Sequence, residues 1–318
     1  MMNKKYYIWI IILVVFLIVL FFAWVKVSGL KTEISQLKND NEKLDANNNE
    51  LQEKIIETSK DFKPLFLLYS NTGFKEPIRI ITHGGYLNIE KNTIDVNWQE
   101  VNLKDIYGIE DDVQFTKDRV PVIIDDSVAK NINGKKISEY NLSELKNYKI
   151  QGAYNLLTLG EWLDFLKNKV KLFIVDTTAV VSIPSDMNFL EIPKIIQKTI
   201  SDHQAEDFAA IQFANPKFLD LVDFNKYKTS WNTLEVQKNY KFTFYTLNPA
   251  WYVTAEKFKE VHNAGAEIIP VNITYATAEK DAERYPATIL AGNKYIMVDY
   301  VPDFIKFCKQ YNIPVYGQ

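Results

Sequence analysis

The sequence has few of the residues that often mark a particular function. Cys308 is the only cysteine, which excludes an intramolecular disulfide and a cysteine-based metal site. Arginine occurs only at Arg79, Arg119 and Arg284, so most of the surface lacks the side chain that clamps phosphate with two hydrogen bonds. The formal net charge is -3, so no basic excess predicts a nucleic-acid partner. The candidates for chemistry are therefore acids and His83, since His203 and His262 lie in predicted helical or loop stretches without an acidic strand partner and are expected at the surface.

Apolar residues are abundant instead. Hydrophobic residues make up 47% of the 318 residues and aromatic residues 14%, which is enough to bury a large core. Residues 6–25 are 20 uninterrupted apolar or aromatic residues, long enough to cross a bilayer as a helix. Tryptophan and tyrosine stand near the two ends of this stretch, as they do at membrane interfaces. A cleaved signal peptide is the alternative, but the apolar run is too long and lacks a convincing small-residue cleavage site.

Residues 1–28 are therefore predicted to anchor the protein in a membrane. Lys4 and Lys5 precede the apolar stretch, whereas Lys26, Lys31 and Lys38 follow it. The positive charges closest to the span favour a cytoplasmic N-terminus. The sequence thus predicts a single-pass membrane protein whose remaining domains lie outside the cytoplasm.

Leucines recur every seven residues directly after the predicted membrane span. Taken as d positions of a heptad repeat, they place two isoleucines and two asparagines at the a positions. The d residues are Leu30, Leu37, Leu44 and Leu51, and the a residues are Ile34, Asn41, Asn48 and Ile55. The pattern predicts a coiled-coil stalk over residues 29–60 that forms a parallel homodimer, with buried asparagines fixing its register. The alternative is a single polar helix that spaces the next domain from the membrane.

From residue 78 onward, short apolar runs alternate with longer helical patterns, which predicts βα units and a parallel sheet. Eight strands are predicted, at residues 78–82, 108–113, 121–124, 171–175, 209–213, 242–247, 267–271 and 295–298. Helices are predicted at residues 159–167, 190–201, 216–223, 255–264 and 302–311. About 240 residues follow the N-terminal segments, a length that suits one (β/α)8 barrel or two small domains.

Acidic residues and one histidine lie on or just after these predicted strands. His83 follows the first strand and precedes two glycines, a place where an exposed imidazole meets a ligand. Glu110 and Asp112 are two residues apart on the second strand, so both carboxylates point to one face. Asp125 and Asp176 follow the third and fourth strands. Because the ends of barrel strands meet at one rim, these residues predict a divalent-cation site beside an acid or base.

The order of these residues resembles that of the glycerophosphodiester phosphodiesterase family, a TIM-barrel group related to sphingomyelinase D and phosphatidylinositol phospholipase C. The shared pattern spans about residues 78–310 and consists of His83-Gly84-Gly85, Glu90-Lys91-Asn92-Thr93, Glu110-Asp111-Asp112, Thr116-Lys117-Asp118, and the runs 121–126, 173–178 and 298–302. The resemblance implies an α/β fold, a TIM (β/α)8 barrel over residues 61–318. It also implies that Glu110, Asp112 and Asp176 bind Ca²⁺ or Mg²⁺, with His83 as acid or base.

Four positions depart from the family pattern. Asp125 stands at the family's second catalytic histidine, and Gly84 stands at its phosphate-clamping arginine. Lys91 and Thr178 replace a loop glutamate and a strand-end lysine. Losing one general acid or base lowers a rate by roughly 10²–10⁴-fold, and losing a cationic stabilising group adds a comparable factor. Asp125 is a substitute acid on the condition that its acidic neighbours keep it protonated.

Two further residues are candidates for contact with a substrate. Lys91 could reach a phosphate from another angle than the family's clamp, the alternative being a surface lysine. Trp251 follows the sixth predicted strand and is a candidate aromatic wall for a lipid or glycerol group. The alternative for Trp251 is packing over the barrel mouth.

Together these features predict a membrane-anchored, metal-dependent phosphodiesterase. Its expected substrate is a glycerophosphodiester, a lysophospholipid headgroup or a glycerol-phosphate polymer. One alternative is a catalytically degenerate barrel that acts as a binding or scaffolding module on a dimeric stalk. Another is a lyase of the sphingomyelinase D kind, in which a substrate hydroxyl attacks the phosphorus, although that branch also relies on two histidines.

Overall fold

A computed structural model divides the chain into two units, Met1–Glu57 and Thr58–Gln318. The structure describes residues 36, 76–84, 106–147, 149–150, 154–233, 237, 239–247, 260–272, 285, 289 and 294–317. In the first unit it describes only Gln36, which is helical and exposed. The predicted membrane span at residues 6–25 and the heptads at residues 30–55 lie outside the described residues and stay predictions. Within the described ranges, no helix is long and apolar enough to cross a membrane.

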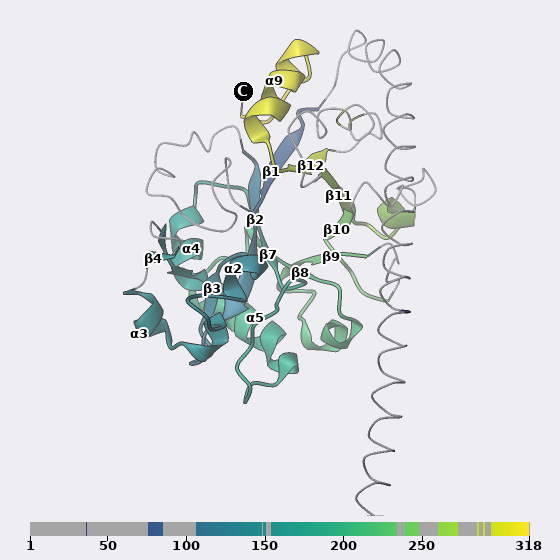
Figure 1. The fold of residues 1–318 in the computed structure, drawn as a ribbon. Helices are drawn as coiled ribbons and strands as arrows, with labels where there is room; N and C mark the ends of the chain where they lie inside the picture. Colours follow the sequence, from purple (N-terminus) through teal and green to yellow (C-terminus); the bar gives the residue numbers. More distant parts are fainter. Residues whose placement is uncertain are drawn as a thin grey trace, which may run out of the picture. The chain divides into compact units, whose positions relative to one another are not determined.

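The second unit contains a closed ring of parallel strands (Figure 1). In the described part of the chain, eight strands form this ring, and β1 closes it by pairing with β2 on one side and β12 on the other. In ring order the strands are β1 (Arg79–His83), β2 (Gly108–Phe115), β7 (Leu172–Asp176), β8 (Ala209–Phe213), β9 (Lys228–Trp231), β10 (Phe244–Leu247), β11 (Glu267–Asn272) and β12 (Tyr295–Val298). The predicted TIM barrel is thereby confirmed.

Side chains along each strand alternate between two apolar cores. In β7, Leu172 and Ile174 belong to the cluster inside the ring, whereas Phe173 and Val175 belong to the larger cluster outside it. Because both faces are buried, such strands read as nearly continuous apolar runs in the sequence. Asp176 continues the inward series of Leu172 and Ile174, so its carboxylate reaches the barrel interior at the end of the strand.

One strand predicted for the ring lies outside it, and one strand of the ring was not predicted. The run at residues 121–124 forms β3 (Pro121–Ile123), which pairs antiparallel with β2 and with β6 (Leu157–Thr158) and stands outside the ring. Only five residues separate β2 from β3, which allows a hairpin but is too short for the crossover that parallel strands need. The ring instead includes β9, which the sequence analysis missed because Lys228, Thr229 and Ser230 do not form an apolar run.

Helices cover the outer face of the ring (Figure 1). The described ones are α4 (Leu159–Leu166), α5 (Ile192–Asp202) and α9 (Val301–Gln310), with the 3₁₀ helices η4 (Phe189–Glu191) and η5 (Pro216–Leu221). Three of the predicted helices are therefore present, and the one predicted at residues 216–223 is a 3₁₀ helix. Of the helix predicted at residues 255–264, the structure describes residues 260–264, and residues 260–263 are helical. Thr158 begins α4 with a reciprocal cap, because its hydroxyl accepts from the Glu161 amide while Glu161 accepts from the Thr158 amide.

A small extension lies between β2 and α4. It contains β3, α2 (Asp126–Ala129), η3 (Ile137–Glu139), α3 (Leu142–Leu145), β4 (Lys149–Ile150), β5 (Tyr154–Asn155) and β6. Its own apolar cluster consists of Val122, Ile124, Ala129, Ile132, Ile137, Leu145 and Leu156. Helices of four residues are too short to show a helical period, so these elements were not predicted.

Asp111 lies on the opposite face of β2 from Glu110 and Asp112. Its Oδ2 accepts a hydrogen bond of 2.6 Å from Trp162 Nε1 of α4, and both side chains are buried. Burial raises the pKa of Asp111 to about 7, and the hydrogen bond from Trp162 opposes part of that rise. This bond fastens the strand that carries the acids to the helix layer.

Replacing Trp162 by Phe should destabilise the fold by about 2 kcal/mol more than replacing Trp231 by Phe. Both tryptophans are buried, so the two changes remove a similar volume. Trp162 gives up a hydrogen bond to a buried carboxyl group, whereas Trp231 Nε1 has no hydrogen-bond partner among the described residues. Urea unfolding measures the difference, and equal losses in the two variants would contradict a stabilising role for the bond.

Candidate active site

Strand register brings three predicted acids together inside the barrel. Glu110 and Asp112 alternate on β2, and Asp176 of β7 is the register partner of Asp112. One carboxylate oxygen from each of the three residues lies within 4.8 Å of the others. Glu110 and Asp176 are buried, with 2% and 7% of their surface exposed, and Asp112 is partly buried. The structure thus assembles the predicted metal-ligating residues at one point.

Burial and mutual repulsion act on these carboxyl groups in the same direction. Burial, followed by the charges of Asp176 and Asp112, raises the pKa of Glu110 well above its ordinary value. Burial and the nearby Asp176 and Asp125 do the same to the pKa of Asp112. Burial also raises the pKa of Asp176, although hydrogen bonds from Thr178 oppose it. Hard oxygen ligands crowded in this way suit Ca²⁺ or Mg²⁺, whose charge relieves the repulsion, so the residues fit a divalent cation.

His83 ends β1 beside this cluster. Its Nδ1 lies 2.8 Å from Oδ1 of Asp299, which follows β12, and its Nε2 lies 3.8 Å from Oε2 of Glu110. A carboxylate beside Nδ1 favours the tautomer that carries its proton there, which leaves Nε2 facing the acid cluster. The His83 side chain is 19% exposed, so solvent and small ligands have access to it. The site therefore pairs a cation-binding cluster with an oriented imidazole.

Gly84, for which the sequence resemblance implied a phosphate-clamping arginine in the family, contacts Glu110 in the structure. Its φ of 61° lies in the left-handed region that glycine adopts without strain. Its amide donates to the carbonyl oxygen of Glu110 at 2.9 Å and to Oε2 of Glu110 at 3.2 Å. The residue thus holds a predicted metal ligand through its backbone.

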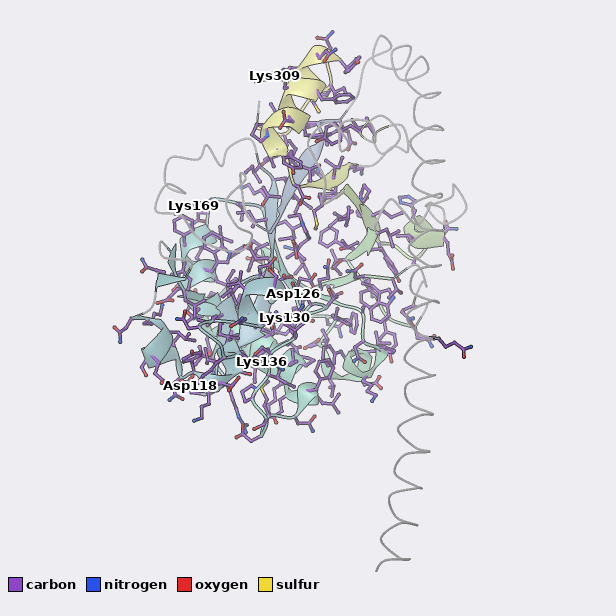
Figure 2. The ribbon with its side chains drawn as sticks, in the orientation of Figure 1. Asp118, Asp126, Lys130, Lys136, Lys169 and Lys309 are labelled. Atoms are coloured by element: carbon purple, nitrogen blue, oxygen red, sulfur yellow. The ribbon has the colours of Figure 1, made fainter. Side chains whose placement is uncertain are left out.

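Asp125 reaches the same region by a different route from the one predicted. It follows β3 of the hairpin, and with Asp112 and Asp126 it forms a second carboxylate trio whose oxygens lie within 4.8 Å. Asp125 caps α2 by accepting hydrogen bonds from the amide, at 2.8 Å, and the hydroxyl of Ser127. Asp126 pairs with Lys130 at 2.6 Å, and Figure 2 shows the two side by side. Hence Asp125 is close to the cluster while also serving as a helix cap.

Each oxygen of Asp176 has its own donor. The Thr178 amide donates to Oδ1 at 2.6 Å, and Gln212 Nε2 donates to Oδ2 at 2.7 Å. The sequence analysis gave no role to Gln212 or Asp299. A signal for Gln212 was present, since it is the one polar residue of the buried strand β8 and shares the inward parity of Ala210. The two predicted substrate contacts, Lys91 and Trp251, lie outside the described residues.

Comparison with known proteins agrees with this architecture. The profile of the family described as "Glycerophosphoryl diester phosphodiesterase family" matches residues 103–317. No curated protein matches the chain. Among solved structures, a glycerophosphoryl diester phosphodiesterase from Parabacteroides distasonis is 21% identical with a TM-score of 0.57, over 78% of this chain and 92% of that one.

Two other solved structures are similar at lower identity. A glycerophosphodiester phosphodiesterase from Agrobacterium tumefaciens is 14% identical with a TM-score of 0.56, over 73% of this chain and 99% of that one. A phosphodiesterase from Oleispira antarctica, solved with the product sn-glycerol-3-phosphate, is 16% identical with a TM-score of 0.57, over 73% and 96%. These likenesses show the fold. Because the family profile covers more than half of the sequence, the chain belongs to the glycerophosphoryl diester phosphodiesterase family.

Proposed function

We propose that the protein is a divalent-cation-dependent phosphodiesterase that hydrolyses a glycerol phosphodiester. The observation that carries this proposal is the trio of Glu110, Asp112 and Asp176, two of them buried and Asp112 partly buried, with the oriented imidazole of His83 at its edge. The trio would hold Ca²⁺ or Mg²⁺, and such a cation supplies a Lewis acid for a phosphoryl oxygen when bound. The solved relative with bound sn-glycerol-3-phosphate supports a glycerol-phosphate substrate.

His83 is the proposed acid or base of the reaction. With the proton of its ring held at Nδ1 by Asp299, its Nε2 would take a proton from water or, once protonated, give one to the leaving oxygen. The Asp299 carboxylate stabilises the imidazolium that forms when Nε2 gains a proton. Asp125, at the position of the family's second histidine, is the proposed partner for the opposite proton transfer. Its place beside Asp112 supports this role, and its use as a cap of α2 counts against it.

The alternative is a catalytically degenerate barrel that binds or scaffolds. Three substituted positions favour it, because each has a structural contact in place of the family's catalytic group. Asp125 caps α2, the Gly84 amide holds Glu110, and the Thr178 amide holds Asp176. A cation site without a second imidazole or a phosphate clamp would then serve binding alone.

The N-terminal predictions complete the proposal. The apolar stretch at residues 6–25 supports a membrane anchor, and the flanking lysines support an extracytoplasmic barrel. The leucine heptads support a parallel homodimer. A barrel anchored to the outer side of the membrane would meet phospholipid-derived diesters or glycerol-phosphate polymers. Lys91 and Trp251 are the proposed substrate contacts.

Release of glycerol 3-phosphate from glycerophosphodiesters by the full-length protein should require added Ca²⁺, Mg²⁺ or Mn²⁺. His83→Ala should lower kcat by about 10²–10⁴-fold, because it removes an acid or base of the reaction. His203→Ala is the matched control and should keep the parent rate, since the His203 ring contacts Asp164 of α4 instead of the acid cluster. An unchanged rate in His83→Ala would contradict its role, and no turnover with any cation would contradict the enzyme hypothesis.

Divalent cations should raise the unfolding temperature of the parent protein, and Glu110→Gln should abolish this shift. A cation present at about 100 times its Kd stabilises the folded state by about 2.7 kcal/mol. Without cation, Glu110→Gln should unfold at a higher temperature than the parent, because it removes one of the repelling carboxylates. Glu191→Gln changes an exposed acid that pairs with Arg119 and should retain the shift.

Calorimetric scans with and without chelator measure these shifts. Stabilisation by cations without turnover would favour the binding module over the enzyme. A parent protein that shows no shift would contradict the cation site itself.

A further inference from the structure

The segment that follows Asp176 is fastened to β2 by one buried side chain. Gln114 lies two residues beyond Asp112, on the same face of β2, and is fully buried. Its Nε2 donates to the Ala179 carbonyl at 2.8 Å, and its Oε1 accepts from the amides of Val181 at 3.0 Å and Ser182 at 3.1 Å. One amide group therefore satisfies three backbone groups of the segment that connects β7 to α5.

Further contacts hold the same segment at Ser182. The Phe115 amide donates to the Ser182 carbonyl at 3.3 Å, and the hydroxyls of Ser182 and Ser138 are 2.8 Å apart. Ser138 and Ser182 are both buried. The first half of the connection is thus fixed against β2 and η3 away from solvent.

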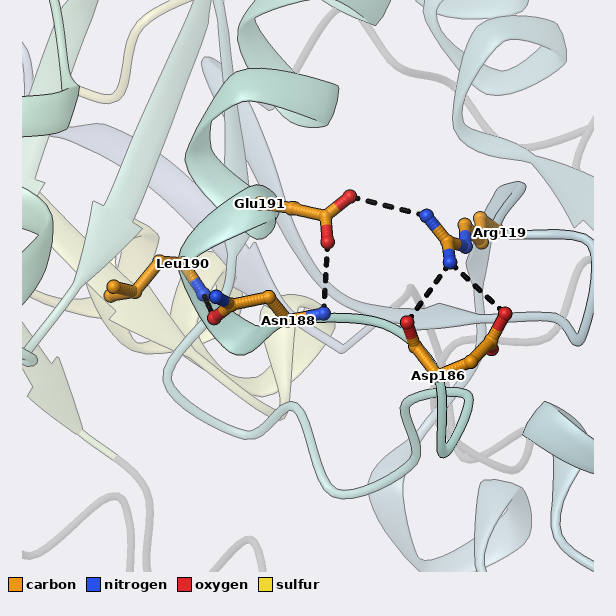
Figure 3. Close-up of polar contacts among 5 residues, drawn as sticks. All are labelled: Arg119, Asp186, Asn188, Leu190 and Glu191. Carbon is orange, nitrogen blue, oxygen red and sulfur yellow. Dashed lines mark hydrogen bonds and ion pairs between the residues drawn. The ribbon is translucent and has the colours of Figure 1, made fainter.

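The second half of the connection is held by exposed charges (Figure 3). Arg119, in the turn between β2 and β3, reaches the carbonyl and Oδ2 of Asp186, each at 3.0 Å, and Oε2 of Glu191 at 3.3 Å. The Arg119 side chain is 39% exposed and that of Asp186 is 74% exposed. Ion pairs exposed to this degree contribute little, so the buried anchor at Gln114 dominates.

Thr178 lies between the end of β7 and Ala179, the first residue that Gln114 holds, and its amide donates to Oδ1 of Asp176. Because Gln114 holds the carbonyl of Ala179, the residue after Thr178, the position of the Thr178 amide depends on Gln114. We propose that Gln114 is a positioning residue of the cation site, which orients Asp176 through the backbone of Thr178 and Ala179. Gln212 holds the other oxygen of Asp176 directly. The inference rests on the proposed function, since it assumes that Asp176 binds a cation.

Through this arrangement, residues on one face of β2 supply or position all three carboxylates. Glu110 and Asp112 belong to that face, and Gln114 extends it to Asp176 through the neighbouring connection. Outer hydrogen bonds that orient a ligating carboxylate typically change metal affinity by about 10–100-fold when removed. The loss of Gln114 should therefore weaken cation binding without removing any ligand.

The test measures Mn²⁺ binding to the full-length protein from the electron paramagnetic resonance signal of free Mn²⁺. Gln114→Met keeps the volume of the side chain but loses its three hydrogen bonds, and should raise the Kd by about tenfold or more. Gln197→Met is the matched control. Gln197 also bridges three backbone groups, those of Pro193, Leu221 and Asp223, but it holds the segment after η5.

The control variant should bind Mn²⁺ within about threefold of the parent, even with a similar fall in unfolding temperature. If Gln114→Met does not fold, Gln114→Asn replaces it, with Gln197→Asn as its control. The shorter amide cannot span the same three groups, so the Kd should again rise about tenfold.

A Glu110→Gln arm separates this inference from the proposed function. Mn²⁺ binding that is lost in Glu110→Gln but unchanged in a folded Gln114 variant overturns the role of Gln114 alone. A parent protein that binds no Mn²⁺, or that binds it equally well after Glu110→Gln, overturns the cation site and with it both proposals. Equal weakening in the Gln114 and Gln197 variants also overturns the inference, because it would reflect a general loss of order.

Discussion

The burial of crowded carboxyl groups inside this barrel, with their mutual repulsion added to it, is the constraint for which much of the surrounding structure compensates. The donors come from neighbouring strand ends, with the Gly84 amide on Glu110, and the Thr178 amide and Gln212 on Asp176. These bonds favour the ionised forms, yet the pKa values of both acids stay raised, since burial outweighs the donors. Neutral donors alone leave negative charge unbalanced, which is the condition under which a site selects a cation.

Two positions at which the sequence resemblance implies departures from the family pattern take part in the site through their backbones. The Gly84 amide donates to Glu110, and the Thr178 amide donates to Asp176. Asp125, at a position where the resemblance implies a histidine in the family, caps a short helix. On the proposed function, the chain keeps the groups that would bind a cation and differs at those that would clamp and protonate a phosphate.

The sequence predicted the barrel and the acid cluster because both leave local signals. Side chains alternate between the two faces of a strand, so Glu110 and Asp112 share one face of β2 regardless of where that strand lies in the fold. The errors arose where the decisive contacts are distant. An apolar run such as β3 has the same sequence pattern whether its strand belongs to a hairpin or to the ring. The less apolar strand β9 forms because it pairs with neighbouring strands of the ring. The roles of Asp299 and Gln114 depend on contacts that no local pattern shows, whereas Gln212 left a local signal as the one polar residue of the buried strand β8.

The contact between His83 and Asp299 joins the first strand of the ring to the end of the last one, across 216 positions of sequence. The Tyr316 amide likewise donates to the carbonyl of Ile78, beside the first strand. During translation the imidazole therefore emerges from the ribosome long before its carboxylate partner does. A nascent or prematurely terminated chain has the acids of β2 but an unoriented imidazole. Only a chain translated past residue 299 can therefore form the contact that orients the imidazole.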